Sequence, residues 1–198
     1  TVKKMNSKRL NYTEMALVFF LAILVRYLFS FFSGVDNFDG PDGIRYIEQS
    51  DRILAGDYNL EEKLFITAPL FPYILAGFKW IFHSNYVVAL EAFQILLSGA
   101  SAVFLMCTAN VTFKNRMTSL LTGLAYCLYP VTLYYVHQFS QESIFQSLFI
   151  ISIFYFSVYL NQGRLNSLLK FSLIFSLALL TKSIILLTLP FLMLSILI

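Results

Sequence analysis

The residues best suited to chemistry begin with three aspartates in a stretch rich in Gly and Pro. Asp36, Asp39 and Asp42 recur at every third position of the segment VDNFDGPDG. Gly and Pro favour a turn here rather than a helix. Three carboxylates on one turn could offer a divalent cation hard oxygen ligands. They could equally cap a helix in a solvated acidic loop, and the spacing alone leaves both interpretations open.

Two further charged residues stand at or within long apolar runs, where a charge needs a partner or a function. Glu142 lies where the chain enters the run 143–160, and Lys182 interrupts the run 168–198. Glu142 could simply favour the positive N-terminus of the next helix, and Lys182 could be a snorkelling lysine. In the functional interpretation, Glu142 faces the same outer cavity as Asp42, and Lys182 holds a lipid phosphate.

Three more polar residues belong to the apolar runs or their ends. Arg26 and Glu91 lie at matched depths, roughly 8–10 Å below the outer surface at 1.5 Å per helical residue. The matched depth predicts a structural ion pair between two helices. His137 follows the run 117–136 and is predicted to be an interfacial histidine.

The composition determines the kind of protein that must position these residues. Of the 198 residues, 58% are hydrophobic and only 13% are charged, against about 25% charged in soluble domains. This excludes a soluble enzyme and a disordered chain, and it predicts an all-α membrane protein. We expect a polytopic helical bundle of five to six transmembrane helices. The apolar runs cover 15–32, 86–111, 117–136, 143–160 and 168–198, the last divided near Lys182.

The charges between these runs predict the orientation. If 68–83 does not cross the bilayer, the segments rich in Lys and Arg fall on one side, and the acidic segment 34–67 falls on the other. The positive-inside rule therefore favours a cytoplasmic N-terminus. It makes 34–85 a first extracytoplasmic loop with amphipathic juxtamembrane helices, one of them from Asp42 to Ala55. We expect a multi-pass protein of a prokaryotic plasma (inner) membrane rather than of the endoplasmic reticulum.

Several short motifs then follow one another in a recognisable order. They are GPD at 40–42 with Arg45-Tyr46, APLFPY at 68–73, LYP at 128–130, QES at 141–143 and LLTK at 179–182. Together they resemble the N-terminal part of the polytopic GT-C glycosyltransferases that use polyprenyl-phosphate sugars. The resemblance is greatest to relatives of protein O-mannosyltransferase and of the lipid A aminoarabinose transferase. It implies one GT-C-like transmembrane domain over 1–198, with further helices expected to follow because the chain ends within an apolar run.

The resemblance also implies roles for individual residues. Asp42 matches the catalytic base of such enzymes, and Glu142 matches a second acid of the catalytic site. Lys182 matches the residue that binds the donor phosphate, and we assign Arg45 to the same task. We assign Tyr46, Asp39 and His137 to substrate binding.

The implied reaction is an inverting displacement on the extracytoplasmic side. The donor would be a polyprenyl-phosphate sugar, and the acceptor a protein, lipid or glycan. Membrane lipids are expected partners, and nucleic acid is not. No residue is assigned as a metal ligand and no resident cofactor is expected, although a divalent metal stays open. The alternative is a non-catalytic scaffold, or a subunit of a membrane complex, that binds a lipid-linked substrate.

Overall fold

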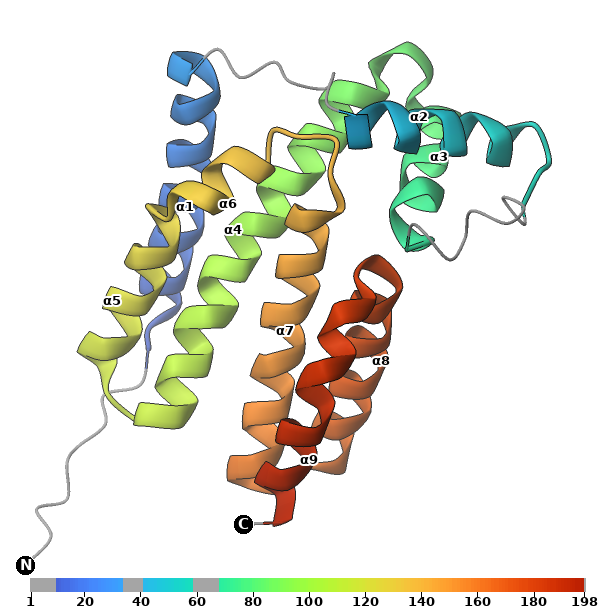
Figure 1. Ribbon diagram of the computed structural model, residues 1–198. Helices are drawn as coiled ribbons and strands as arrows, with labels where there is room; N and C mark the ends of the chain where they lie inside the picture. The colour runs from blue at the N-terminus through green and yellow to red at the C-terminus, as the bar shows by residue number, and fades with distance from the viewer. Residues whose placement is uncertain (1–9, 34–40, 59–67, 198) are drawn as a thin grey trace, which may run out of the picture.

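The computed structural model describes residues 10–33, 41–58 and 68–197, and every regular element in these ranges is helical (Figure 1). This confirms the predicted all-α class. A bundle of long helices carries a group of shorter helices at one end (Figure 1). The bundle consists of α1 (Tyr12–Ser33), α4 (Tyr86–Phe113), α5 (Arg116–Cys127), α7 (Gln141–Gln162) and α8 (Leu165–Thr181).

Helix α4 is the centre of the bundle. It packs against α1, α5 and α7, and α7 packs in turn against α8. One core cluster contains Val18 from α1, Met106 from α4 and Tyr126 from α5. A second joins Phe156 of α7 to Phe175 of α8. The apolar runs therefore form helices that pack against one another, although most of these helices do not concentrate their apolar residues on one face.

Local sequence explains why neighbouring helices turn back on each other. Lys114 ends α4 with a left-handed backbone at φ +53°. The side chain of Asn115 then accepts hydrogen bonds from the backbone N–H groups of Met117 (2.9 Å) and Thr118 (3.2 Å), which caps α5. Gly163 ends α7 at φ +66°, a conformation that glycine adopts without steric cost. Such short connections make consecutive helices antiparallel.

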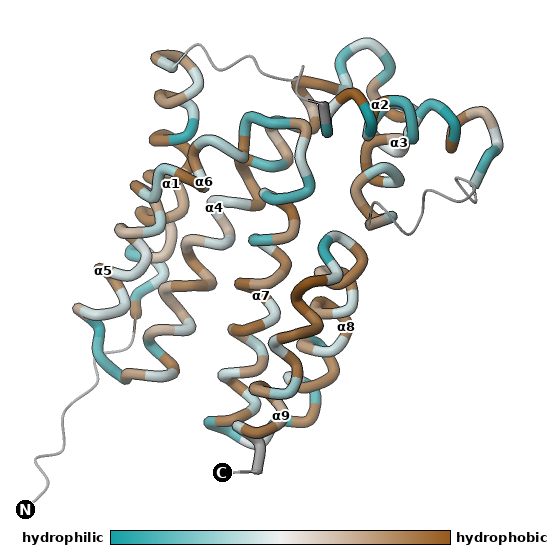
Figure 2. Tube along the Cα trace, in the orientation of Figure 1, coloured by the Kyte–Doolittle hydropathy of each residue, from teal (hydrophilic) through white to brown (hydrophobic). Residues whose placement is uncertain are grey.

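The shorter helices gather at the end opposite these turns. They are α2 (Pro41–Leu54), α3 (Leu70–Phe82) and α6 (Pro130–Tyr135), with the connection 136–140 beside them. The most hydrophilic segments shown in Figure 2 are α2 and the connection before α7. A 3-10 turn, η2 (His83–Asn85), joins α3 to α4. This end of the molecule carries the predicted site residues that the structure describes.

Helix α2 lies where the sequence predicts it, but it buries a different face. The sequence pattern places Ile44, Ile47 and Leu54 near one apolar face of this helix, with Tyr46 and Ile53 beside it, and predicts that this face lies on the membrane. In the structure Ile44 and Leu54 are exposed, and the buried side chains are Tyr46, Gln49, Ser50 and Ile53. These four recur at helical spacing and face α3. The buried face is therefore the predicted apolar side shifted toward Tyr46 and Ile53, and it also includes the polar Gln49 and Ser50.

Three apolar helical segments are long enough to cross a membrane: Tyr12–Ser33, Leu70–Phe113 and Gln141–Gln162. The second of these comprises both α3 and α4. Helix α3 alone has 13 residues and is about 20 Å long, less than the roughly 30 Å of a bilayer core. Helix α8 and the segment Ser183–Ser195 are apolar but shorter. The number of spans, predicted as five to six, therefore stays a prediction.

The predicted division of the last apolar run is confirmed. Helix α8 ends at Thr181, and Lys182 has an extended backbone at φ −156° and ψ 102°. The chain continues as the 3-10 helix η3 (Ser183–Thr188) and then as α9 (Leu189–Leu197). Lys182 thus lies at the corner of a helical hairpin, at the end of α8 that contacts α3.

Candidate active site

The two charged residues that stand out in the apolar runs form one ion pair. Nζ of Lys182 lies 3.2 Å from Oε1 of Glu142. The ammonium also lies 5.8 Å from the centre of the Phe145 ring, one helical turn beyond Glu142. Both charged side chains are about one third exposed, 36% for Lys182 and 30% for Glu142. A ligand can therefore reach a cation and an anion that lie 40 residues apart in the chain.

The predicted base lies on a second element, in the first turn of α2. Asp42, Arg45 and Tyr46 have spacings of three and four residues and share one helical face. Nη1 of Arg45 is 3.8 Å from Oδ1 of Asp42, and the Asp42 side chain is 72% exposed. Glu142 likewise lies in the first turn of its helix, α7. Both carboxylates thus also benefit from the positive end of a helix, as the simpler interpretation predicted.

Tyr46 links the two elements. Its side chain is buried, and its ring lies 4.8 Å from that of Phe71 in an edge-to-face contact. The surrounding core cluster includes Leu90 of α4 and Ile144 of α7. Burial, together with the carboxylates of Glu142 and Asp42, raises the pKa of Tyr46 to about 12. Both predicted acids therefore act on one phenol, which stays protonated at neutral pH as a possible hydrogen-bond donor.

The prediction that Arg26 and Glu91 form an ion pair is wrong, because each of them has other partners. Instead, Nδ1 of His137 lies 2.7 Å from Oε1 of Glu91, and Nε2 of His137 lies 3.1 Å from the backbone oxygen of Arg26. The depths of Arg26 and Glu91 do match, but a histidine from the connection before α7 stands between them. His137 is buried and uses both ring nitrogens in these contacts, and its predicted role in substrate binding stays a prediction.

Arg26 finds its own partners within the bundle. Nε donates to Oγ of Ser98 at 2.8 Å, Nη1 donates to the backbone oxygen of Ala22 at 2.9 Å, and Nη2 reaches Oγ1 of Thr132 at 3.4 Å. The guanidinium carbon also lies 5.3 Å from the centre of the Tyr126 ring. A fully buried arginine therefore ties α1 to α4, α5 and α6 just below the site.

A cluster of buried polar atoms next to Glu142 was not expected from the sequence. Most helical hydroxyls in the described chain donate to a carbonyl of their own helix, as Thr108 and Ser152 do. Ser143 and Ser147 of α7 are buried and have no such partner there. The spacing of these two serines, four residues apart at the start of an apolar helix, is the signal that could have identified them. The site end of α7 is therefore more polar inside than its hydropathy suggests.

The metal hypothesis is not tested by the structure. Asp36 and Asp39 lie outside the described residues, so the role of Asp39 in substrate binding also stays a prediction. Among the residues that the structure does describe, no group of three His, Cys, Asp or Glu side chains could hold a metal ion.

Comparison with protein families gives the decisive observation. Residues 67–198 match the family of dolichyl-phosphate-mannose-protein mannosyltransferases. The chain belongs to this family. Membership of the mannosyltransferase family points to glycosyltransferase activity, with a lipid-linked sugar donor and an acceptor. It also agrees with the resemblance found from the short motifs.

The residues matched by the family include only part of the candidate site. Glu142, Lys182 and His137 lie inside the matched residues, whereas Asp42, Arg45 and Tyr46 precede them. No curated protein and no solved structure matches the chain. The roles of individual residues therefore depend on the geometry described above.

Proposed function

We propose that this protein transfers a sugar from a polyprenyl-phosphate donor to an acceptor at the extracytoplasmic surface of the membrane. The observation that carries the proposal is the accessible Lys182–Glu142 pair, with both Glu142 and Asp42 acting electrostatically on Tyr46. A cation and two carboxylates at one end of an apolar bundle fit a reaction that separates a sugar from a lipid phosphate. Membership of the mannosyltransferase family supplies the class of reaction.

The chemistry follows from these charges. An acceptor hydroxyl attacks the anomeric carbon from the face opposite the phosphate, and its proton passes to the carboxylate of Asp42. The bond between the anomeric carbon and the phosphate oxygen breaks, and the electron pair leaves with polyprenyl phosphate. Lys182 and Arg45 stabilise the negative charge that develops on the leaving group. This single displacement inverts the anomeric centre.

Glu142 and Tyr46 have supporting roles in this proposal. Glu142 holds the Lys182 ammonium in place before the donor binds, at the 3.2 Å distance observed. Tyr46 is protonated at neutral pH and can donate a hydrogen bond to substrate or to a neighbouring carboxylate. We further propose a cytoplasmic N-terminus, because the positive-inside rule predicts that the segments rich in Lys and Arg lie on the cytoplasmic side. We also propose that the membrane is a prokaryotic inner membrane. The acceptor is a protein, lipid or glycan.

The test is a transfer assay with a labelled polyprenyl-phosphate mannose and purified protein in lipid nanodiscs. Asp42→Asn and Lys182→Ala should each reduce the release of polyprenyl phosphate by at least about 100-fold, the usual range for an acid–base or charge-stabilising group. Glu48→Gln, on the exposed side of α2, and Lys170→Ala, on α8, are the matched controls. Their release rates should stay close to that of the original protein.

Two results would count against the proposal. Full release in Asp42→Asn would remove Asp42 as the base. Donor binding without release of polyprenyl phosphate in the original protein, tested with several classes of acceptor, would favour the alternative of a non-catalytic scaffold. No observation in the described structure favours that alternative over an enzyme.

A further inference from the structure

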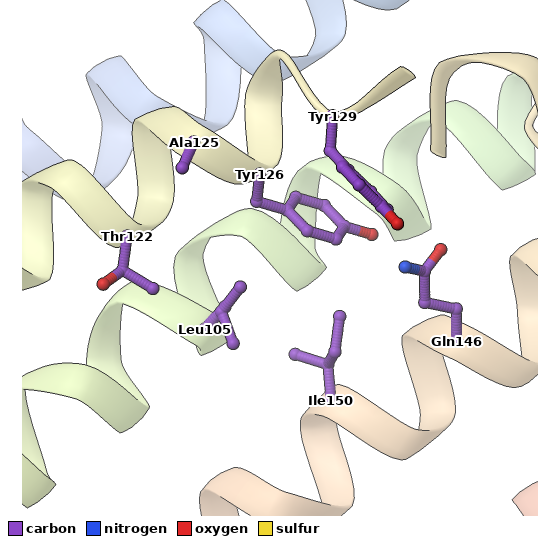
Figure 3. A pocket seen from close by; sticks show the side chains of 7 residues that line it. All are labelled: Leu105, Thr122, Ala125, Tyr126, Tyr129, Gln146 and Ile150. Carbon is purple, nitrogen blue, oxygen red and sulfur yellow. The ribbon is translucent and has the colours of Figure 1, made fainter. Parts of the chain in front are cut away.

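A crevice within the bundle lies apart from the Lys182–Glu142 pair. It has a volume of about 500 Å³, in the range of small-molecule sites. Its walls come from α4, α5 and α7, and include the apolar side chains of Leu105, Ala125 and Ile150. Figure 3 shows the side chains of Tyr126, Tyr129 and Gln146 at its other end. No lining residue carries a charge.

Two polar groups of the crevice have no partner in the described protein. Tyr126 lies 3.3 Å from Ser98 through its hydroxyl. In contrast, neither the Tyr129 hydroxyl nor the Gln146 amide makes a hydrogen bond to any residue described here, and Figure 3 shows both polar ends directed toward the open space. An unpaired amide or hydroxyl facing hydrocarbon costs several kcal/mol. Tyr129 is 49% exposed and the Gln146 side chain is partly buried, so both polar groups stay accessible to a polar group of an occupant.

The position of Gln146 defines the chemistry of that group. Gln146 follows Glu142 by four residues, so it lies about 6 Å further along α7 and near the same helical face. The headgroup layer of a bilayer is about 5–7 Å deep on each side. If Glu142 lies among headgroups, Gln146 lies at the level of the glycerol esters. The Gln146 NH₂ group and the Tyr129 O–H are donors, and an ester carbonyl is an acceptor.

We propose that this crevice binds one acyl chain of a membrane glycerolipid, with the ester carbonyl held by Gln146 and Tyr129. The apolar walls formed by Leu105 and Ile150 receive the chain, and the absence of charge among the lining residues excludes a phosphate inside the crevice. This lipid is distinct from the lipid-linked sugar at Lys182. The inference does not depend on the proposed function.

A second crevice supplies an internal comparison. It measures about 450 Å³ and is lined mainly by apolar side chains of α1, together with Leu133 of α6. It has no amide or tyrosine among its lining residues. If the polar groups determine binding, a lipid should occupy the first crevice in preference to the second.

The test is photo-crosslinking of the full chain in nanodiscs of dioleoyl phosphatidylcholine that contain a trace of the same lipid with a diazirine in one acyl chain. Peptides that cover 122–129 and 146–150 should carry more label than peptides of α1. Labelling should fall at least about fivefold in Gln146→Leu combined with Tyr129→Phe, equivalent to the loss of about 1 kcal/mol of hydrogen bonding. Leu28→Met in the second crevice is the control and should leave the pattern unchanged.

Three outcomes would overturn the inference. The first is equal labelling of all the lipid-facing helices. The second is unchanged labelling of the crevice in the double variant. The third is displacement of the label by polyprenyl phosphate added to the same nanodiscs, which would assign the crevice to the sugar carrier. If the double variant fails to fold, Ile150→Trp, which fills the apolar part of the crevice, should cause the same fivefold loss.

Discussion

Tyr46 is the residue where the candidate site and the protein core meet. Its phenol is buried against Phe71, and this burial, together with the carboxylates of Glu142 and Asp42, raises its pKa to about 12. The pKa of an unfolded tyrosine is about 10, so the folded state binds the proton more tightly. The stabilisation is complete below about pH 10 and is lost as the pH rises through about 12.

We therefore predict that Tyr46 stays mostly protonated at about pH 11. The measurement is the tyrosinate absorbance of the original protein minus that of Tyr46→Phe over an alkaline titration. Tyr58→Phe, which removes an exposed tyrosine of the same segment, gives the reference difference curve. Ionisation of Tyr46 near pH 10, about the pKa of an unfolded tyrosine, would show that burial and the two carboxylates do not raise its pKa.

Arg26 is the residue whose loss should harm the bundle most. Its side chain is fully buried, and its three nitrogens have partners on α4, on α1 itself and on α6. Arg26→Leu would leave Ser98 and Thr132 without their donor. We predict a loss of about 2–4 kcal/mol in the free energy of unfolding.

The measurement is chemical unfolding in detergent or lipid nanodiscs, with Arg164→Leu as the control because Arg164 is exposed. The control should change stability by less than about 0.5 kcal/mol. Equal effects of the two substitutions would show that the buried network contributes no specific stability.

At the scale of elements, close helix approach depends on glycine. A Cβ atom built at Gly123 of α5 lies 3.2 Å from Cβ of Met106 on α4 and 3.2 Å from Cγ1 of Val18 on α1. Neither atom can move without a shift of its helix, because Met106 Cβ is fixed to the backbone and Val18 is β-branched. Gly77 of α3 has nothing within 4 Å of the same position.

Gly123→Ala should therefore destabilise the protein by about 1–2 kcal/mol through overpacking. Gly77→Ala should be neutral or stabilising by up to about 1 kcal/mol, because alanine favours the helix. Thermal unfolding of the two variants side by side provides the measurement. A neutral Gly123→Ala would mean that α5 does not pack as closely on α1 and α4 as the structure describes.

The connection before α7 shows how elements position chemistry. His137 anchors this connection to Glu91 of α4 and to the backbone of Arg26 on α1. Five residues later, Glu142 lies in the first turn of α7 and pairs with Lys182 from the end of α8. The Glu142 carboxylate thus lies on the N-terminal turn of an anchored helix rather than on a loop. This suits a site in which charged groups must keep fixed positions relative to one another.

At the scale of the whole molecule, the charges divide between two ends. Glu14 at the start of α1 pairs with Arg116 at the start of α5, at the end predicted to be cytoplasmic. Helix α2 lies at the opposite end (Figures 1 and 2). Since the positive-inside rule acts on Lys and Arg in short loops, we predict that Lys114 faces the cytoplasm and Tyr58 faces outward.

Cysteine labelling checks this orientation. Cys107 and Cys127 are free thiols and would first be replaced by serine. A membrane-impermeant maleimide should then label Tyr58→Cys in intact cells, and should label Lys114→Cys only after permeabilisation. The reverse pattern would place α2 and Asp42 in the cytoplasm and would rule out an extracytoplasmic reaction.

The sequence by itself determined the class of fold, the positions of most helices and the break at Lys182. These follow from local properties: apolar runs form helices to satisfy their backbone in a membrane, and capping residues and charges end them. The run 117–136, expected as one helix, is divided into α5, which ends at Cys127, and α6, which begins at Pro130. The short motifs also indicated the family, and the isolated charges marked Glu142 and Lys182 as residues in need of a partner.

Only the tertiary structure decided which side chains meet. Glu142 pairs with Lys182, His137 separates Glu91 from Arg26, and Tyr46 rather than Ile44 faces the core. Hydropathy and spacing describe each helix alone, whereas these contacts depend on how far one helix is rotated and shifted against another. That arrangement is determined by packing across the whole bundle, where residues distant in sequence compete for the same partners.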